Sequence, residues 1–219
     1  MMKKSIAAIM TVFALAACAP DQANTNQAEN APVAAQQVPH DAAAWTAENS
    51  QVIFLSSKIN KQLNSITEQS SFTTSTARLD KEGNFTMNVD LSSVKTNIDI
   101  RDQRLKDWVF EIAQFPQAEI SGKLDPNAVN MLEVGESLHL KQPLSLNIHG
   151  QKLDIEADLS VQRNSADSIS VNTLAPVLLD VKKMDMVQGV AKLVEVMGLS
   201  SIVEQVPVSF SAEFKRSAE

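Results

Sequence analysis

The chain has 219 residues, of which 44% are hydrophobic and 21% are charged, as in ordinary globular proteins. Its formal net charge is −7, and without Lys3 and Lys4 the remaining 17 basic and 26 acidic residues give −9. This acidic balance argues against nucleic acids and anionic lipid head groups as partners. The only cysteine, Cys18, excludes an intramolecular disulfide bond.

Residues 1–17 are predicted to be a signal peptide. Two lysines precede an apolar run from Ile6 to Ala17, which is shorter than the ~20 residues of a membrane-spanning helix. Cys18 follows Leu15-Ala16-Ala17, which resembles a bacterial lipobox, where the cysteine is acylated. The alternative is an ordinary signal peptide with an incidental cysteine. We favour the lipoprotein, and Ala19, by analogy, implies sorting to the outer membrane, facing the periplasm.

Residues 18–44 are predicted to be the acylated cysteine followed by a flexible tether. From Ala19 on, this segment is rich in Ala, Gln, Asn and Pro and has no Leu, Ile, Phe or Trp, so it cannot bury enough apolar surface to order itself. A flexible segment of ~25 residues reaches about 25–30 Å, enough to hold a domain off a bilayer. Composition does not change again after Trp45, so residues 45–219 are predicted to form one domain.

Short strands dominate the predicted domain. Phe85, Met87, Val89 and Leu91 alternate with polar residues, which is the period of a strand with one apolar face. Turn signals at Asp80–Gly83 and His149–Lys152 separate such runs. Many short strands joined by turns are typical of an antiparallel barrel or sandwich. The predicted strands are Val52–Leu55, Phe72–Leu79, Phe85–Leu91, Ala118–Leu124, Leu138–Ile148, Leu153–Val161, Ile169–Leu179 and Val206–Phe214.

A first short helix is predicted over Asp102–Phe110. Asp99 or Asp102 can accept hydrogen bonds from its first turn, and Pro116 prevents the helix from continuing. Arg101, beside Asp102, has two interpretations. It could bind a carbonyl or phosphate oxygen of a ligand head group, or Asp102 could cap the helix while Arg101 or Arg104 forms a local charge pair. We favour the second, structural interpretation.

A second helix is predicted over Asp185–Met197, with Asp185 as its cap and Gly198 just beyond its end. Gly189 in its interior weakens it by up to ~1 kcal/mol relative to Ala. Because this helix is rich in Met, a flexible residue, we expect it to line or gate a cavity. The alternative is a rigid plug in a ligand-free core. The residues expected to face the cavity are Met186, Val190, Leu193 and Met197.

The segment between Ser92 and Pro116 carries a specific motif. It contains, in order, Ser93-Val94-Lys95-Thr96, Arg101-Asp102, Leu105, Val109-Phe110 and Phe115-Pro116. This order resembles the YceI-like family, also called polyisoprenoid-binding proteins, and the resemblance runs from about Trp45 to Phe214. The sequence departs from the family at Trp45 and Glu48, positions often held by Tyr and Asp. The resemblance implies an all-β fold, an extended antiparallel eight-stranded lipocalin-like barrel with two short helices.

The interior of an eight-stranded barrel is either filled by side chains or holds one small ligand, and composition alone leaves both open. The resemblance favours the second, because members of that family hold a long isoprenoid chain. We therefore expect a bound isoprenoid lipid, a quinone or another amphiphilic lipid. The candidate ligand-binding residues are Phe54, Met87, Phe110, Phe115, Leu146, Ile155, Val177, Met186, Val190, Leu193 and Phe210.

Catalytic motifs are missing from the sequence. His40, His139 and His149 do not have metal-ligand spacing, and there is no Gly-x-Ser-x-Gly, glycine-rich phosphate loop or CxxC. We expect no enzyme activity, no metal and no catalytic cofactor, so a lipid hydrolase or isomerase is the weakest hypothesis. The favoured prediction is a lipid-anchored periplasmic carrier or store of an isoprenoid. The alternative is an envelope protein–protein interaction module with a solid barrel core, and a homodimer is left open.

Overall fold

The computed structural model describes residues 44–48 and 50–217. These residues belong to one compact unit. The predicted signal peptide, Cys18 and the tether up to residue 43 lie outside the described residues. Among the described residues, no helix is long and apolar enough to cross a membrane.

Eight antiparallel strands close into a barrel, which confirms the predicted fold class. Each strand pairs with the next, and β13 pairs with β1 through Arg216 and Trp45 to complete the ring. The alternating apolar residues of these strands face the interior, where they form most of the buried core. The ring consists of β1 (Trp45–Glu48), β4 (Ser75–Leu79), β5 (Asn84–Asp90), β7 (Gln117–Lys123), β8 (Ser137–Ile148), β9 (Gln151–Ser165), β10 (Ser168–Thr173) and β13 (Gln205–Arg216).

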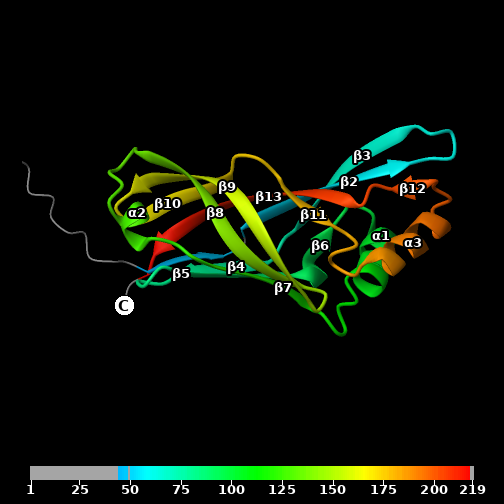
Figure 1. Cartoon of the computed structure of the whole chain (residues 1–219), viewed down its shortest axis with the longest axis horizontal. Coiled ribbons are helices and arrows are strands. Elements are labelled where there is room, and N and C mark those ends of the chain that lie inside the picture. The colour runs from blue at the N-terminus through cyan, green and yellow to red at the C-terminus, as the bar shows by residue number, and fades with distance from the viewer. Residues whose placement is uncertain (1–43, 49, 218–219) are drawn as a thin grey trace, which may run out of the picture. The chain divides into compact units, whose positions relative to one another are not determined.

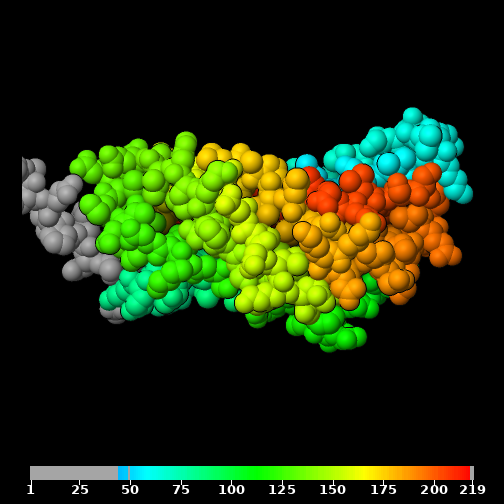
Figure 2. Space-filling model, in the orientation of Figure 1, coloured from blue at the N-terminus to red at the C-terminus, as the bar shows by residue number. Residues whose placement is uncertain are grey.

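The sheet continues beyond this ring because β13 is long enough to change partners. Its first half pairs with β11 (Val177–Asp180) on one side and β2 (Gln51–Ile59) on the other. β2 then forms a hairpin with β3 (Ser65–Phe72). Figures 1 and 2 show this hairpin projecting at the end of the domain where the helices α1 (Asp99–Arg104) and α3 (Val187–Val196) lie. The two remaining short strands are β6 (Val94–Lys95), beside β3, and β12 (Ser201–Ile202), beside β2.

The first predicted helix is present but is built differently. α1 (Asp99–Arg104) continues into a π-helical turn, η2 (Leu105–Val109), after a short 3-10 turn, η1 (Leu91–Ser93). Its N-cap is Ile98, which makes no side-chain cap. The prediction that Asp99 or Asp102 caps this helix is therefore wrong, and the carboxylate of Asp102 instead accepts hydrogen bonds from Thr96.

The second predicted helix is α3 (Val187–Val196), and Gly198 follows it with a φ of +61°, as expected of a residue just past a helix end. Its N-cap is Met186 without a side-chain bond, so the cap predicted at Asp185 is wrong. A further helix, α2 (Pro126–Asn130), was not predicted from the sequence. It is only five residues long and begins after Asp125, whose side chain accepts a hydrogen bond from Asn127.

The barrel end beside α2 is filled by a fully buried aromatic side chain. The Trp45 indole is completely inaccessible, and the guanidinium of Arg163 lies 4.9 Å from its ring centroid. The indole N–H donates to Asn130 of α2 at 3.4 Å. α1, its continuation η2 and α3, which packs against η2, lie toward the opposite end (Figure 1).

Candidate functional site

An apolar cavity occupies the barrel interior. Its volume is about 190 Å³, which corresponds to roughly a dozen water-sized groups. Side chains from most strands of the ring line it, together with Val52 of β2, Phe72 of β3 and two residues of β11. The interior is therefore hollow, which is at odds with the solid core of the interaction-module hypothesis.

The few polar residues in the cavity wall are mostly satisfied by the backbone. The side-chain amide of Gln142 donates to the carbonyl oxygens of Lys123 and Pro143 at 3.1 and 2.8 Å. The Thr173 hydroxyl accepts a hydrogen bond from the Phe210 amide at 3.1 Å. The wall thus presents almost entirely apolar surface to an occupant, and it selects for shape and hydrophobicity rather than for polar groups.

Five of the eleven candidate ligand-binding residues line the cavity. They lie on five different strands, from β5 to β13, so tertiary structure brings together residues that are far apart in the sequence. Three of them, Met87, Leu146 and Ile155, come from strictly alternating runs and face inward as that pattern predicts. The five are Met87, Leu146, Ile155, Val177 and Phe210.

Three candidate phenylalanines lie outside the cavity lining. The rings of Phe54 and Phe110 each stand 5.5 Å from the ring of Phe72, so they pack against a lining residue without being in the lining themselves. Phe115 packs against His149, with ring centroids 4.5 Å apart, at the β8–β9 turn. Glu111 contacts the same histidine, with its carboxylate 2.9 Å from Nε2 of His149. Phe115 therefore packs on a turn and does not line the cavity.

The remaining three candidates, Met186, Val190 and Leu193, belong to α3 or its N-cap, and none lines the cavity. α3 packs instead against the π-helical turn η2. A Cβ atom at Gly189 would lie 1.9 Å from the backbone oxygen of Trp108, so the two helices touch through this glycine. The helix was expected to line or gate the cavity, but it packs on η2 instead, and Gly189 allows the two backbones to approach closely.

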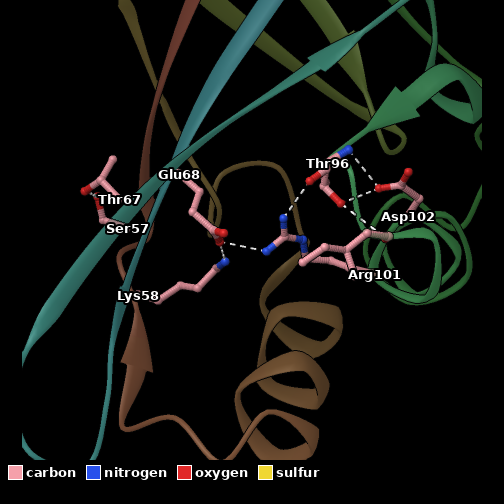
Figure 3. A network of polar contacts seen from close by, with 8 residues as sticks. Ser57, Lys58, Thr67, Glu68, Thr96, Arg101 and Asp102 are labelled. Atoms are coloured by element: carbon pink, nitrogen blue, oxygen red, sulfur yellow. Dashed lines mark hydrogen bonds and ion pairs between the residues drawn. The ribbon is translucent and has the colours of Figure 1, made fainter.

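A polar cluster joins the β2–β3 hairpin to α1 and the segment before it (Figure 3). Arg101 of α1 donates from Nη1 to Oε2 of Glu68 at 2.7 Å and from Nη2 to the Thr96 carbonyl oxygen at 2.8 Å. The ammonium of Lys58 also contacts Oε2 of Glu68. The Asp102 carboxylate accepts hydrogen bonds from both the amide (2.8 Å) and the hydroxyl of Thr96.

Sequence reasoning missed most of this cluster. Glu68 lies in β3, whose sequence from Ser65 to Phe72 is too polar to show a strand pattern. Lys58 could have been found, because it shares the alternating face of β2 with Val52 and Phe54. The predicted local charge pair at Arg101 is wrong in its partner, since Glu68 is 33 residues away.

Burial disfavours the charged forms of both cations in this cluster. The pKa of Lys58 is lowered from its ordinary value chiefly by burial and also by the nearby positive charge of Arg101. Burial likewise lowers the pKa of Arg101, and the charge of Asp102 opposes that shift. Elsewhere among the described residues, no cluster of His, Cys, Asp and Glu has the composition of a metal site.

Comparison with known proteins identifies the relatives of this barrel. The YceI-like domain matches residues 40–214. A polyisoprenoid binding domain from Saccharophagus degradans, implicated in plant cell wall breakdown, superposes with a TM-score of 0.75 at 29% identity, covering 80% of this chain and 99% of that one. BcnA from Burkholderia cenocepacia shares the fold, with a TM-score of 0.53, 18% identity and coverage of 75% and 95%. No curated protein matches the sequence.

Proposed function

The chain belongs to the YceI-like family, and from this premise we propose that it holds a long isoprenoid or a related amphiphilic lipid inside its barrel. The fold itself supports a lipid-binding role. The finer proposal is that the bound molecule is carried or stored and that no reaction is catalysed. The similar domain from Saccharophagus degradans, which binds polyisoprenoid, supports this choice of ligand class.

The apolar cavity is the observation that carries the proposal. Its wall consists of inward aliphatic and aromatic side chains, and the polar groups of Gln142 and Thr173 are occupied by the backbone. A tail that buries roughly 600 Å² of apolar surface contributes about 15 kcal/mol before any costs. Ordering the tail and restricting its motion offset at least several kcal/mol of that gain. Tight binding is therefore feasible from the apolar contacts alone.

Solvent extraction followed by mass spectrometry tests this function. The protein is purified from bacteria without detergent, extracted, and compared with a mock purification from cells that lack it. We expect an amphiphilic lipid with an isoprenoid tail in the protein sample only. If no lipid is extracted, and the delipidated protein also takes up no farnesyl-tailed probe, the binding function is refuted.

We further propose that the domain is held in the bacterial envelope, facing the periplasm, by acylation of Cys18. The support is the short apolar run before Leu15-Ala16-Ala17-Cys18 and the tether composition up to Ala44. Globomycin, which inhibits the lipoprotein signal peptidase, should make the uncleaved precursor accumulate in cells. Normal processing in its presence, with a free thiol on Cys18, would contradict the anchor and leave lipid binding by the barrel untouched.

A further inference from the structure

The polar cluster lies on the same face of the β2–β3 hairpin as the cavity wall. Val52 and Phe72 are paired across this hairpin, and both line the cavity. Because side chains alternate along a strand, Lys58, six residues after Val52, and Glu68, four residues before Phe72, point to that same inward side. At the rise of a β-strand, Glu68 stands about 13 Å beyond Phe72.

Aromatic side chains separate the cavity from the cluster. Phe72 belongs to the cavity wall, and its ring contacts the rings of Phe54 and Phe110, each 5.5 Å away. Phe54 lies between Val52 and Lys58 along the inward face of β2. The order along this face is therefore an apolar cavity, then aromatic rings, then charged groups. An amphiphilic molecule with a long tail has the same order of polarity.

The cluster contains more hydrogen-bond donors than acceptors. Lys58 and Arg101 share the single carboxylate of Glu68, because the nearby Asp102 is bonded to Thr96. Nε of Arg101 is buried and has no hydrogen-bond partner. An unpartnered buried donor is unfavourable, and a bound acceptor would remove that cost.

Glu68 is also the most exposed member of the cluster. Its side chain is 37% exposed, against 9% for Lys58 and 12% for Arg101. The carboxylate can therefore turn toward water while both cations stay in place. The vacated position beside Lys58 and Arg101 then suits another oxygen atom, and a negative charge on that oxygen would strengthen the contact.

We propose that Lys58 and Arg101 bind the head group of the lipid whose tail fills the barrel, through head-group oxygens that accept hydrogen bonds. This inference rests on the proposed function and adds the orientation of the ligand, with its head toward α1 and its tail toward Trp45. Carbonyl and phosphate oxygens share the required chemistry. The competing explanation is that the cluster only holds α1 against the β2–β3 hairpin.

The test compares three probes that share one tail: a farnesyl-substituted benzoquinone, farnesyl phosphate, and the farnesyl hydrocarbon without a head group. Binding to the delipidated full chain is measured for Arg101→Met and Lys58→Met. We expect the affinity for the quinone probe, the phosphate probe or both to fall by about tenfold or more, because a charge-assisted hydrogen bond is lost. The affinity for the hydrocarbon should stay unchanged.

Two further variants separate a head-group role from a structural one. Glu68→Gln removes the competing carboxylate but keeps the side-chain size, so farnesyl phosphate should bind as well as before or more tightly. Lys95→Met, a change at a half-exposed lysine outside the cluster, should alter nothing. Loss restricted to the quinone or to the phosphate supports the site and tells which oxygen it binds.

Other outcomes overturn the inference. An equal loss for all three probes would mean that the cluster only supports the fold. Equal binding of all three probes by the cluster variants and by the unmutated protein would place the head group elsewhere while leaving lipid binding intact. Failure of the unmutated protein to bind any probe would instead refute the proposed function on which the inference rests.

Discussion

At the scale of single residues, Asp102 ties α1 to the segment that precedes it. Its buried carboxylate accepts hydrogen bonds from the amide and the hydroxyl of Thr96, just after β6. It therefore fixes the backbone that leads into the helix, although it does not cap the helix. Arg101 binds the Thr96 carbonyl oxygen from the other side, so one short turn is held by two neighbouring side chains.

Asp102→Ala should lower the free energy of unfolding by about 2 kcal/mol, because two hydrogen bonds to a charged group are lost and the buried Thr96 amide is left without a partner. Urea denaturation measures this change. Asp99→Ala is the matched control, since that side chain is almost fully exposed, and it should change stability by no more than about 0.5 kcal/mol. Equal losses in both variants would contradict the role assigned to Asp102.

Lys58 should make the protein more stable as pH rises through the alkaline range. Its pKa is lowered in the folded state by burial and by Arg101. Between that lowered value and the ordinary value of 10.5, the unfolded chain binds a proton that the folded protein does not bind. Below this window the cost of burying the ammonium is fully present, and it disappears as pH rises through the window.

Lys58→Met should abolish this alkaline increase and leave stability at neutral pH equal or higher, because Glu68 keeps Arg101 as its partner. Urea denaturation of both proteins between neutral pH and about pH 10.5 measures the difference. Parallel pH profiles for the two proteins would show that Lys58 is not the group responsible. The free-energy cost of burying the Lys58 ammonium is of the kind that proteins commonly bear at binding sites.

At the scale of elements, the close contact between α3 and η2 depends on Gly189. Ala is favoured over Gly inside helices by about 1 kcal/mol, so helix propensity alone predicts that Gly189→Ala stabilises. The added Cβ would instead lie 1.9 Å from the Trp108 backbone oxygen. Backbone atoms cannot move aside as a flexible side chain can, so the whole helix must shift.

We therefore expect Gly189→Ala to destabilise the protein by about 1–3 kcal/mol, the range for overpacking. Thermal or urea denaturation checks the sign. Gln188→Ala, at the neighbouring exposed position of the same helix, should be neutral or slightly stabilising. A stabilising effect of Gly189→Ala would mean that α3 does not pack tightly on η2.

At the scale of the whole described domain, the hollow barrel is the property from which lipid binding follows. The strands close into a ring, so they have inward faces all around, and those faces do not fill the space between them. One end is occupied by Trp45 and Arg163, and the other carries the helices and the charged cluster. The two ends thus differ in structure, because an aromatic ring fills one and helices with a charged cluster lie at the other.

Filling the cavity should remove the lipid without unfolding the protein. Ala157 lines the cavity, so Ala157→Phe places its ring in empty space and should change stability by less than about 1 kcal/mol. Mass spectrometry of solvent extracts should then find little or no lipid. Ala47→Phe is the matched control, because Ala47 is buried outside the cavity lining.

That control should cost roughly 1–3 kcal/mol through overpacking. If Ala157→Phe destabilises the protein as much as Ala47→Phe does, the interior is effectively solid. If it retains its lipid at full occupancy, the lipid is bound elsewhere on the protein.

The sequence alone was enough to predict, at least in part, seven of the eight ring strands, whereas β1 was not predicted and the predicted strand Val52–Leu55 belongs to β2, outside the ring. Met87, Leu146 and Ile155 face the cavity because an alternating pattern is a local property of a strand. The motif from Ser93 to Pro116 was enough to indicate the family. The short helix α2 and the polar strand β3 were missed because neither has an apolar period of its own.

Only the tertiary structure decided which elements lie opposite one another. Phe54 and Phe110 are apolar as predicted, yet both pack against Phe72 and lie outside the cavity lining. Gly189 by itself suggests a flexible helix, but the structure places the Trp108 backbone directly against it. Lys58 belongs to a charged cluster only because the fold brings Glu68 and Arg101 next to it. The physical reason is that a periodic pattern reports the side of its own strand or helix that is buried, whereas a binding site depends on what another part of the chain places against that side.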